Sequence, residues 1–589
     1  MKRFLSVCTL FLILFDSFSQ INKYGVPFID NYPTQITPGS EQNWCIEKDI
    51  FGNLYFGNQD KGIIRYDGTK WSAIEIKNNP RIHSLKGDDR GIIYVGAAFE
   101  FGYIQPDAKG KMQYVSLSSR VDSIAEVRLI YSIEVINNKV YFLSPKFIYV
   151  YDIQKDTLSK IDILKFNLGD AFRLVKVNDT YIVADNGNGL YELKDSILTP
   201  LPNGNFFKSL RCTTLMPYDE SKVLITTYFD GLFLYDYKTG TVNSNFIDKK
   251  LNDILKTVNV YAAAKISEDQ FAIGTTTDEG ILIIDKSGKL IQQITKENSE
   301  LEDNTILSLY CDYKNGHELW ISTLGVISKA YTNIPVTKLF DKHGLDNGVN
   351  DICEFQGDIY ISSDAGIYKS VTDNQNSLVF EKIKATPSQV FPLEVIKSTG
   401  GDFMLAGSLD GVIQINSENS FRRIESVCRN LPGGNKTKLD AKKIVQSKKS
   451  PDQIYLGMQA GGVIILKYQG NSWTFLNRIK GFPGLVTGIV EKNDRNGLWL
   501  STDDPTAIYS VDINGADTTV VQYKSEKGIP DTELNSINVI NNELYVTTAR
   551  GILKYDNVAD KFVDGNDITG GYSTDKYIQN LFCDNENDI

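Results

Sequence analysis

The chain has 589 residues, a length that calls for several domains or for an array of repeated units. Apolar residues make up 42% of it and aromatic residues 11%, so the chain can bury a sizeable core and is not intrinsically disordered. Its formal net charge is −11, and no segment contains a cluster of lysine or arginine residues. This balance argues against nucleic acid as a partner of this part of the protein.

Residues 1–19 have the pattern of a secretory signal peptide. Lys2 and Arg3 form the charged start, residues 4–15 the apolar stretch, and Ser17-Phe18-Ser19 a cleavage site between small residues. A membrane anchor is the alternative, but twelve apolar residues are too few to span a bilayer. We therefore expect the mature chain to be periplasmic or otherwise extracytoplasmic, with membrane contact only through segments beyond residue 589.

The rest of the chain repeats one pattern, which is clearest at residues 309–331. An apolar stretch ends at Asp312, a polar turn runs through Gly316, and a second apolar stretch covers residues 319–323. A last apolar stretch follows Gly325. Asp and Gly supply the side-chain cap and the positive φ that tight turns need. Each copy therefore predicts three short strands joined by two turns.

The middle of this pattern occurs twelve times, about once every 45 residues. The copies lie at residues 54–57, 93–96, 140–142, 180–182, 223–226, 271–274, 319–322, 359–362, 403–407, 454–457, 498–501 and 544–547. A period of this length with several short strands per unit is typical of propeller blades. Helical periodicity is modest and confined to residues 251–256. We predict an all-β chain of stacked or side-by-side β-propellers.

An additional strand is predicted ahead of the first copy, at Phe28–Tyr32. As an outer strand it would pair with the third strand of the seventh copy, Val326–Tyr331, and so close a first ring of seven blades. Val336–Phe340 would start a second ring in the same way, which places the boundary near Asn333. The predicted organisation is a signal peptide at 1–19, a first propeller at 20–333 and a second at 334–589.

The second propeller is predicted to be incomplete. Residues 577–584 open a thirteenth copy, which stops at Ile589 before its aromatic residue is reached. A natural end here would leave a strand unpaired, so we expect the chain to be the front part of a longer protein. Such a fragment should expose apolar strand edges.

The repeat resembles the two-component regulator propeller repeat. The shared features are Asp-x-x-Gly, then Leu-Trp-Ile-Gly/Ser-Thr and, after two residues, Gly-Ile/Leu and Tyr-Asp. They are clearest at residues 43–67, 306–331, 485–512 and 534–556. They are less clear at residues 127–152 and 173–191. The resemblance covers nearly all of residues 28–589. It implies two seven-bladed propellers in the periplasm, followed by a triple-tyrosine immunoglobulin-like domain, a membrane helix and a histidine kinase or DNA-binding output domain. Many members sense glycan breakdown products.

The resemblance thus implies the ligand-sensing region of a bacterial two-component regulator that responds to a glycan-derived or other small ligand. Two alternatives stay open: a secreted propeller enzyme, a lyase or hydrolase acting on polysaccharide, and a non-catalytic adhesion or scaffold propeller. A homodimer is a further option. A histidine kinase domain is expected only beyond this portion.

No catalytic motif, metal site or cofactor site is predicted. His83, His317 and His343 lie in three different repeats and lack the spacing of a zinc site or a catalytic triad, so we interpret each as structural or solvated. The acidic pairs Asp88-Asp89 and Asp503-Asp504 are interpreted mainly as turn caps rather than as calcium ligands or acid catalysts. The cysteines left after cleavage are interpreted as structural core residues, although a disulfide stays open.

One face of the ring is the predicted ligand site. The turn between the second and third strands of a blade opens on the same face as the connection to the next blade. The candidate residues on this face are Phe99, Glu100, Phe101, Asn186, Tyr228, Phe229, Asp230, Asp410 and Asp503. Aromatic rings beside carboxylates and amides suit a polyhydroxylated ligand such as an oligosaccharide. The alternative is that these rings cover a contact between propellers or between two copies of the chain.

Overall fold

In the computed structural model, the described residues are 25–565 apart from positions 317, 333, 335, 340–343, 346, 373–377, 385, 399, 417–420, 435–436, 532–533 and 550. The predicted signal peptide, the thirteenth copy, His317 and His343 lie outside the described residues. Two compact units divide the chain: residues up to 343 together with 372–378, and residues 344–371 together with 379 onward.

Each of the twelve predicted copies forms the second strand of its own sheet, antiparallel to both neighbouring strands, which confirms the repeat. These strands are β3 (Leu54–Asn58), β7 (Ile93–Ala97), β11 (Lys139–Leu143), β15 (Thr180–Asp185), β19 (Lys222–Thr227), β23 (Gln270–Thr275), β27 (Glu318–Ser322), β30 (Asp358–Ser363), β34 (Phe403–Ser408), β39 (Gln453–Met458), β43 (Gly497–Thr502) and β47 (Glu543–Thr548). Most of their residues are buried, because each second strand has neighbouring blades on both faces.

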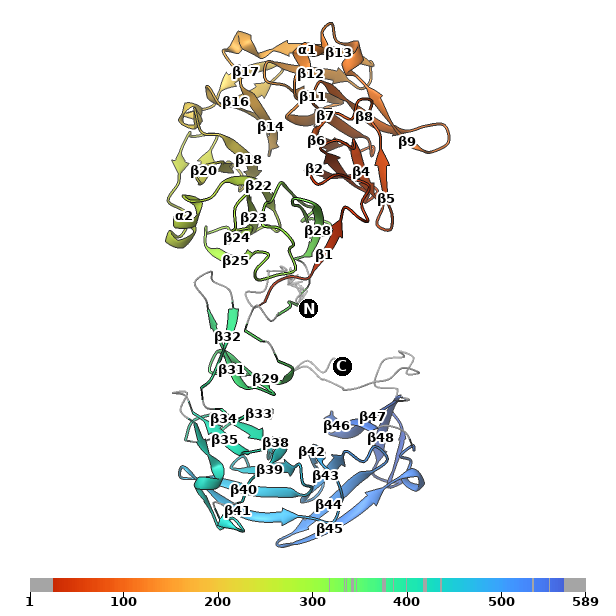
Figure 1. The fold of residues 1–589 in the computed structure, drawn as a ribbon, viewed down its shortest axis with the longest axis vertical. Coiled ribbons are helices and arrows are strands. Elements are labelled where there is room, and N and C mark those ends of the chain that lie inside the picture. Colours follow the sequence, from red (N-terminus) through yellow and green to blue (C-terminus); the bar gives the residue numbers. More distant parts are fainter. Residues whose placement is uncertain are drawn as a thin grey trace, which may run out of the picture. The chain divides into compact units, whose positions relative to one another are not determined.

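Seven of the sheets form the first unit, whose blades are arranged around a common centre (Figure 1). Its innermost strands are β2 (Asn43–Lys48), β6 (Ile82–Gly87), β10 (Ser132–Ile136), β14 (Ala171–Val177), β18 (Cys212–Pro217), β22 (Val260–Lys265) and β26 (Ser308–Cys311). Each contacts the next, and β26 contacts β2. The first unit is therefore a closed ring of seven blades, which we number from the blade of β2.

The remaining elements of this unit complete its blades. Third strands are β4 (Ile63–Tyr66), β8 (Glu100–Pro106), β12 (Phe147–Asp152), β16 (Gly189–Lys194), β20 (Leu232–Asp236), β24 (Ile281–Asp285) and β28 (Val326–Tyr331). Outer strands are β5 (Trp71–Ile74), β9 (Met112–Ser116), β13 (Thr157–Asp162), β17 (Ile197–Pro200), β21 (Val242–Asn243), β25 (Leu290–Ile294) and β1 (Ile29–Pro33). The connections hold the helices α1 (Ile124–Val127) and α2 (Lys249–Leu255) and short 3-10 turns at Ser118–Arg120, Ile163–Phe166 and Gly204–Phe207.

Strand β1 closes the ring as predicted. It pairs antiparallel with β28, with Ile29 opposite Ala330 and Pro33 opposite Val326. The seventh blade is therefore built from both ends of the unit. The predicted strand at Val336–Phe340 is not seen in its described part, where Lys338 instead pairs with Val26 in an isolated bridge.

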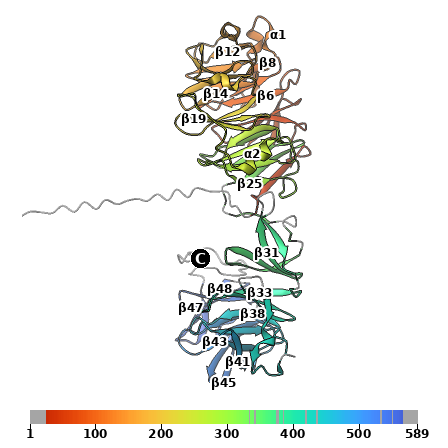
Figure 2. The ribbon, with the colours of Figure 1, turned by 90° about the vertical axis from the view of Figure 1, so that its left-hand side faces the viewer.

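The second unit contains five described blades, and Figure 2 shows its strands from the side. Its innermost strands are β29 (Val349–Phe355), β33 (Val390–Ile396), β38 (Ala441–Gln446), β42 (Val486–Glu491) and β46 (Leu534–Ile540). Its other strands are β31 (Gly366–Thr372), β32 (Leu378–Lys382), β35 (Gly411–Ile415), β36 (Phe421–Arg423), β37 (Cys428–Arg429), β40 (Val463–Gln469), β41 (Ser472–Ile479), β44 (Ile508–Asn514), β45 (Asp517–Tyr523), β48 (Gly551–Asp556) and β49 (Lys561–Asp564), with 3-10 turns at Ile424–Ser426 and Ser525–Lys527. That this unit belongs to a second seven-bladed ring stays a prediction.

The Asp-x-x-Gly turns act as side-chain caps, as predicted. Asp88 Oδ1 accepts hydrogen bonds from the backbone N–H groups of Arg90 and Ile92, both at 3.0 Å, while Gly91 adopts φ +84°. Asp88 Oδ2 accepts a further bond from the hydroxyl of Tyr94 on the following strand, at 3.1 Å. The acid and the aromatic residue of the repeat thus hold the turn and the strand together.

Candidate functional site

Five innermost strands of the first unit carry a β-bulge directly after their first residue. The register shifts leave one residue per strand without a ladder partner, and these residues are Trp44, His83, Phe172, Thr213 and Tyr261. A bulge re-aims the side chain of its extra residue. Because the innermost strands surround the ring axis, the bulges bring side chains of different blades toward one another at the end where these strands begin.

Aromatic contacts confirm this convergence. The ring of Trp44, from blade 1, lies 5.7 Å from His83 of blade 2 and 6.2 Å from Tyr261 of blade 6. Tyr131 of blade 3 lies 6.3 Å from His83, and Tyr228 of blade 5 lies 6.3 Å from Tyr261. Blades 1 and 6 are separated by blade 7, so the contact between Trp44 and Tyr261 reaches past a whole blade near the axis.

Three arginines lie among these rings. The guanidinium of Arg81 lies 5.8 Å from the ring centre of Trp44, and that of Arg211 lies 4.8 Å from the ring centre of Tyr228. Arg173 donates from Nε to the carbonyl oxygen of Thr213 at 2.7 Å. Burial lowers the pKa of Arg173, and the positive charge of Arg211 acts in the same direction.

We call this group the axial cluster. It consists of Trp44, Arg81, His83, Tyr131, Arg173, Arg211, Tyr228 and Tyr261, which come from six of the seven blades. All eight side chains keep some exposure to solvent. A ligand can therefore reach the cluster without displacing the blade cores.

His83 has an unusual environment within the axial cluster. Burial, together with the charges of Arg81 and Arg173, lowers its pKa to about 4. Its Nε2 atom is buried without a hydrogen-bond partner. The ring is therefore neutral at neutral pH, and one of its polar atoms is left unbonded within the described part of the chain.

Among the predicted ligand residues, Tyr228 belongs to the axial cluster, and Phe229 and Asp230 follow it in the turn after β19. The ring of Phe229 is 64% exposed and lies 4.5 Å from that of Tyr228. Asp230 is exposed, and its backbone N–H donates to Thr227 Oγ1 at 3.0 Å. The structure thus brings these three predicted residues together.

The neighbouring prediction at residues 99–101 needs correction. Phe99 is 55% exposed, as expected. Phe101 is fully buried and stacks on Tyr149 at 5.1 Å, because β8 begins at Glu100 and alternation turns Phe101 into the blade contact. Glu100 Oε1 accepts hydrogen bonds from several neighbours, including the hydroxyl of Ser116 at 2.8 Å. Phe101 is a core residue, and Glu100 fixes the local backbone.

The other three predicted residues do not join the axial cluster. Asn186 donates to Asp170 at 2.8 Å, although its Oδ1 is buried without a partner. Asp410 and Asp503 belong to the second unit, where Asp410 pairs with Lys438 at 3.0 Å and Asp503 accepts from a backbone N–H at 2.8 Å. Of the predicted residues, Tyr228, Phe229 and Asp230 are therefore the ones that lie together at the axial cluster.

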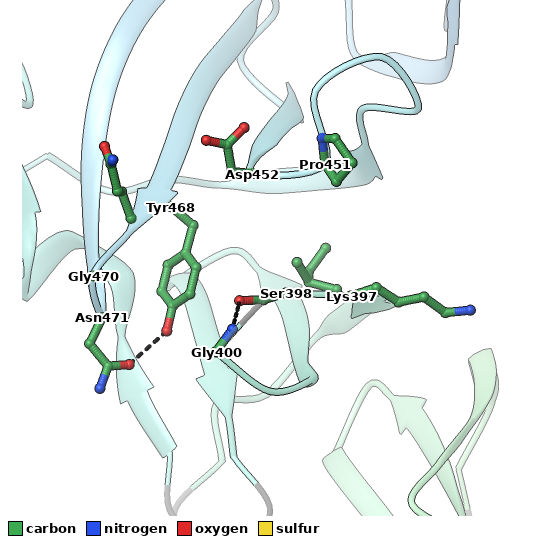
Figure 3. Close-up of a pocket in the computed structure, with 10 residues that line it drawn as sticks. Lys397, Ser398, Gly400, Pro451, Asp452, Tyr468, Gly470 and Asn471 are labelled. Carbon is green, nitrogen blue, oxygen red and sulfur yellow. Dashed lines mark hydrogen bonds between the residues drawn. The ribbon is translucent and has the colours of Figure 1, made fainter.

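A separate hollow of about 610 Å³ lies in the second unit, between turns of two neighbouring blades. Tyr468 is its aromatic residue, and its hydroxyl donates to Asn471 at 2.7 Å. Figure 3 shows this bond and shows the side chain of Lys397 directed away from Tyr468. Since Tyr468 is the one aromatic residue in the lining, this hollow offers less stacking surface to a sugar than the axial cluster does.

Metal and disulfide chemistry find no support in the part of the chain that the structure describes. No group of three or more His, Cys, Asp or Glu side chains there is placed to hold a metal ion. The five described cysteines, Cys45, Cys212, Cys311, Cys353 and Cys428, are all free thiols. Burial raises the pKa of Cys212 to about 12, so this thiol stays protonated.

Comparisons with known proteins show that the chain shares its fold with solved structures. No family model and no curated protein matches the chain. The extracellular domain assigned to a hybrid two component system of B. thetaiotaomicron is similar, with 16% identity, a TM-score of 0.53 and coverage of 95% of this chain and 81% of that one. An extracellular domain assigned to a one component system of the same organism has 14% identity, a TM-score of 0.40 and coverage of 95% and 80%. Virginiamycin B lyase from Staphylococcus aureus has 13% identity, a TM-score of 0.40 and coverage of 51% and 98%.

The first of these similarities shows a shared fold over almost the whole chain. Twelve small sheets in succession, each with a core of antiparallel strands and seven of them closed into a ring, define a β-propeller protein. The fold therefore agrees with the one implied by the resemblance to the two-component regulator propeller repeat.

Proposed function

We propose that this chain is the extracytoplasmic ligand-sensing region of a bacterial signal-transduction protein of the two-component type, and that the axial cluster binds its ligand. The observation that carries the proposal is the convergence of aromatic and polar side chains from six blades on one end of the ring axis. The shared fold with an extracellular domain of a hybrid two component system supports it.

Most of these side chains lie outside the cores between the blades, although Tyr131 packs against the core between blades 4 and 5. Core clusters between the blades consist of strand residues such as Tyr55, Ile63, Ile93 and Val95, which are fully buried. Trp44, by contrast, keeps an accessible surface at the bulge of its strand. Large aromatic residues that gather at a surface without serving the core mark a binding site.

The ligand that we propose is small and polyhydroxylated, as a glycan fragment is. Flat ring faces can stack on the apolar face of a sugar, while guanidinium groups and phenolic hydroxyls bond its hydroxyls. Because the cluster draws on six blades, a bound ligand would bridge them and favour one state of the ring. Such differential affinity is what a sensor needs in order to shift a population toward its signalling state.

Export of the chain belongs to the same proposal, because the candidate signal peptide would place the sensor outside the cytoplasm. No helix among the described residues is long and apolar enough to cross a membrane. The sensor would then reach its output domain through segments that follow residue 589.

A secreted enzyme acting on polysaccharide is the second candidate. Hydrolysis of a glycosidic bond commonly uses two carboxyl groups. The axial cluster contains no carboxylate, which favours binding over hydrolysis at this site. Incubation of the protein with a panel of polysaccharides, followed by assays for new reducing ends and for the absorbance of unsaturated sugars, separates the two candidates. We expect neither signal.

The experiment that tests binding is a thermal-shift screen of the protein against oligosaccharides of two to six sugar units. At saturation, a ligand present at 100 times its Kd stabilises the folded state by about 2.7 kcal/mol. We expect at least one saccharide to stabilise the wild type and to lose this effect when Tyr228 is replaced by alanine. Stabilisation that persists in the variant would place the site elsewhere.

A further inference from the structure

The charge of the axial cluster defines its ligand more closely. We propose that the cluster binds an acidic saccharide, in which a carboxylate or a sulfate ester is attached to a sugar ring with one flat apolar face. This inference rests on the proposed function, because it specifies the ligand of the same site.

The first argument is the absence of counter-charges. Arg81, Arg173 and Arg211 come from blades 2, 4 and 5, and in the part of the chain that the structure describes none of them lies within 4.0 Å of a carboxylate oxygen. Elsewhere in the chain, Arg90 and Arg120 pair with aspartates at 2.5 and 2.6 Å. Three guanidinium groups gathered at one end of the axis create a local positive field that no neighbouring carboxylate neutralises.

The groups share one electrostatic environment. The positive charges of Arg81 and Arg173 both lower the pKa of His83. The positive charge of Arg211 lowers the pKa of Arg173 in the same way. Tyr261 feels the charges of all three arginines. The cationic groups therefore lie close enough to act together, and an anion placed among them would relieve their mutual repulsion.

Unused hydrogen-bond donors are the second argument. Arg173 uses Nε and Nη1 to bond the backbone carbonyl oxygens of Thr213 and Phe172, which fixes the plane of its guanidinium and leaves Nη2 free. The side chains of Arg81 and Arg211 form no hydrogen bond within the described part of the chain. The planar guanidinium fork matches the geometry of carboxylate and sulfate oxygens, so these donors suit an anion with several oxygens.

Among the described residues, the buried Nε2 of His83 has no hydrogen-bond partner either. A buried polar atom without a partner calls for an explanation, because burial without a hydrogen bond is costly. The neutral imidazole can donate from one nitrogen and accept at the other. A hydroxyl of the ligand that bonds Nε2 would satisfy this atom.

The aromatic rings argue for a sugar rather than for a free inorganic anion. Arg81 lies over Trp44 and Arg211 lies over Tyr228, so cationic groups and ring faces belong to one surface. Phosphate or sulfate ions would use only the arginines. An acidic sugar would use both, since its ring stacks on an aromatic face while its acidic group meets a guanidinium.

The chain as a whole repels anions, because its net charge is −11. The local field of the three arginines is therefore a specific feature of this site rather than part of a general basic surface. Asp230, in the turn beside Tyr228, is exposed and forms no ion pair with these arginines.

The test compares matched sugars that differ in the group at C6, which is neutral, a carboxylate or a sulfate ester. Galactose, galacturonate and galactose 6-sulfate form one set, and glucose, glucuronate and glucose 6-sulfate form another; oligomers of the same sugars extend each set. Binding is measured by titration calorimetry and by thermal shift at constant ionic strength. We expect the acidic sugars of each set to bind at least tenfold more tightly than the neutral sugar. Comparison of the uronate with the 6-sulfate shows whether the site prefers a carboxylate or a sulfate ester.

Arg211→Gln is the diagnostic variant, because the side chain is exposed and the substitution removes only its charge and fork. Arg429→Gln, an exposed site in the second unit, makes the same change of charge and serves as the matched control. We expect Arg211→Gln to weaken acidic ligands at least tenfold and neutral ones less than twofold, whereas the control changes neither. Circular dichroism and the unliganded Tm verify that both variants fold.

The outcomes separate this inference from the proposed function. Neutral sugars that bind the wild type as tightly as acidic ones, and that lose affinity in Tyr228→Ala, would overturn the acidic ligand and leave the sensor site intact. Binding that is unchanged in both Arg211→Gln and Tyr228→Ala, or the absence of any binding, would overturn both.

Discussion

The indole of Trp44 lies 5.7 Å from the imidazole of His83, with the two ring planes inclined by 24°. These residues belong to the innermost strands of adjacent blades, and each occupies the bulge of its strand. Near the axis, the blades therefore meet through polar aromatic rings in addition to the aliphatic cores between their sheets. A site assembled from single residues of many blades is sensitive to any ligand that spans them.

The first prediction concerns the turn after β19. Replacement of Tyr228 and Phe229 by alanine should abolish ligand-induced stabilisation, because it removes the stacking surface beside Arg211. Since both rings are at least partly exposed, the unliganded free energy of unfolding should change by less than about 1 kcal/mol. Thermal shift with and without the best saccharide measures both quantities.

Phe101→Ala is the matched control, because the same pattern in the sequence suggested both sites. Phe101 is fully buried, so its replacement should cost about 3 to 5 kcal/mol of stability. Ligand affinity at a temperature where the variant is folded should stay unchanged. A large loss of stability in the Tyr228 and Phe229 variant would show instead that these rings belong to the core.

The second prediction concerns the Asp-x-x-Gly turns. Asp88→Ala should destabilise the first propeller by about 2 to 4 kcal/mol, because two backbone N–H groups and the hydroxyl of Tyr94 lose their acceptor. Asp89→Ala is the control at the adjacent exposed position and should change stability by less than about 0.5 kcal/mol. Chemical denaturation measures both. Equal effects of the two substitutions would contradict the capping role.

The third prediction concerns the closure of the ring by β1. Tyr32 packs against Trp71 at 5.2 Å and against Trp320 at 5.8 Å, so Tyr32→Ala should cost about 1 to 3 kcal/mol. Asp30→Ala, on the same strand, removes an exposed bond from Tyr331 and a long surface ion pair with Lys329, and should cost less than about 1 kcal/mol. If the two variants melted at the same temperature, the packing of β1 would contribute little to closure.

The fourth prediction is a dependence of stability on pH. Burial and the nearby arginines lower the pKa of His83 from 6.5 to about 4, so the unfolded chain takes up this proton more readily than the folded chain. Stability due to His83 is therefore complete above pH 6.5 and is lost as the pH falls toward 4. The variant His83→Gln should lose less stability than the wild type between pH 7 and 4.

Glu47 acts in the opposite direction in an overlapping range. Burial raises its pKa to about 7 from 4.5, so the folded state gains stability relative to the unfolded state as the pH falls through this window. Only the difference between wild type and His83→Gln isolates the histidine. Parallel stability profiles of the two proteins would exclude the predicted contribution of His83.

The sequence predicted the blades well because their determinants are local. The period of about 45 residues reflects one supersecondary unit per copy, and each turn carries its own Asp and Gly. Even the distant pairing of β1 with β28 could be predicted, since Phe28–Tyr32 precedes the first copy as outer strands precede later ones. The completion of the second ring stays a prediction, because the thirteenth copy lies outside the described residues.

The axial cluster could not be predicted in full. Trp44, His83 and Tyr261 share a bulge position and an aromatic ring, but a bulge depends on backbone register rather than on local composition, so the sequence alone does not mark it. One signal was present: each residue comes second in its strand, just before the apolar run. The prediction that Phe101 faces a ligand was wrong for a related reason, because it depended on the register of β8. A shift of one residue at the start of a strand moves each side chain to the opposite face.

The most direct test of the central claim, that ligand binds at the axial cluster, is the fluorescence of Trp44. Of the five tryptophans, Trp320, Trp473 and Trp499 are buried within blades, with exposed fractions of 3%, 0% and 5%. Trp71 is half-buried on the outer strand β5, stacked on Tyr66, and Trp44 lies in the cluster. Titration with the saccharide that gives the largest thermal shift should change the tryptophan emission of the wild type. The variant Trp44→Phe should bind that saccharide with little of this change. A fluorescence response that persists undiminished in Trp44→Phe would contradict binding at the axial cluster.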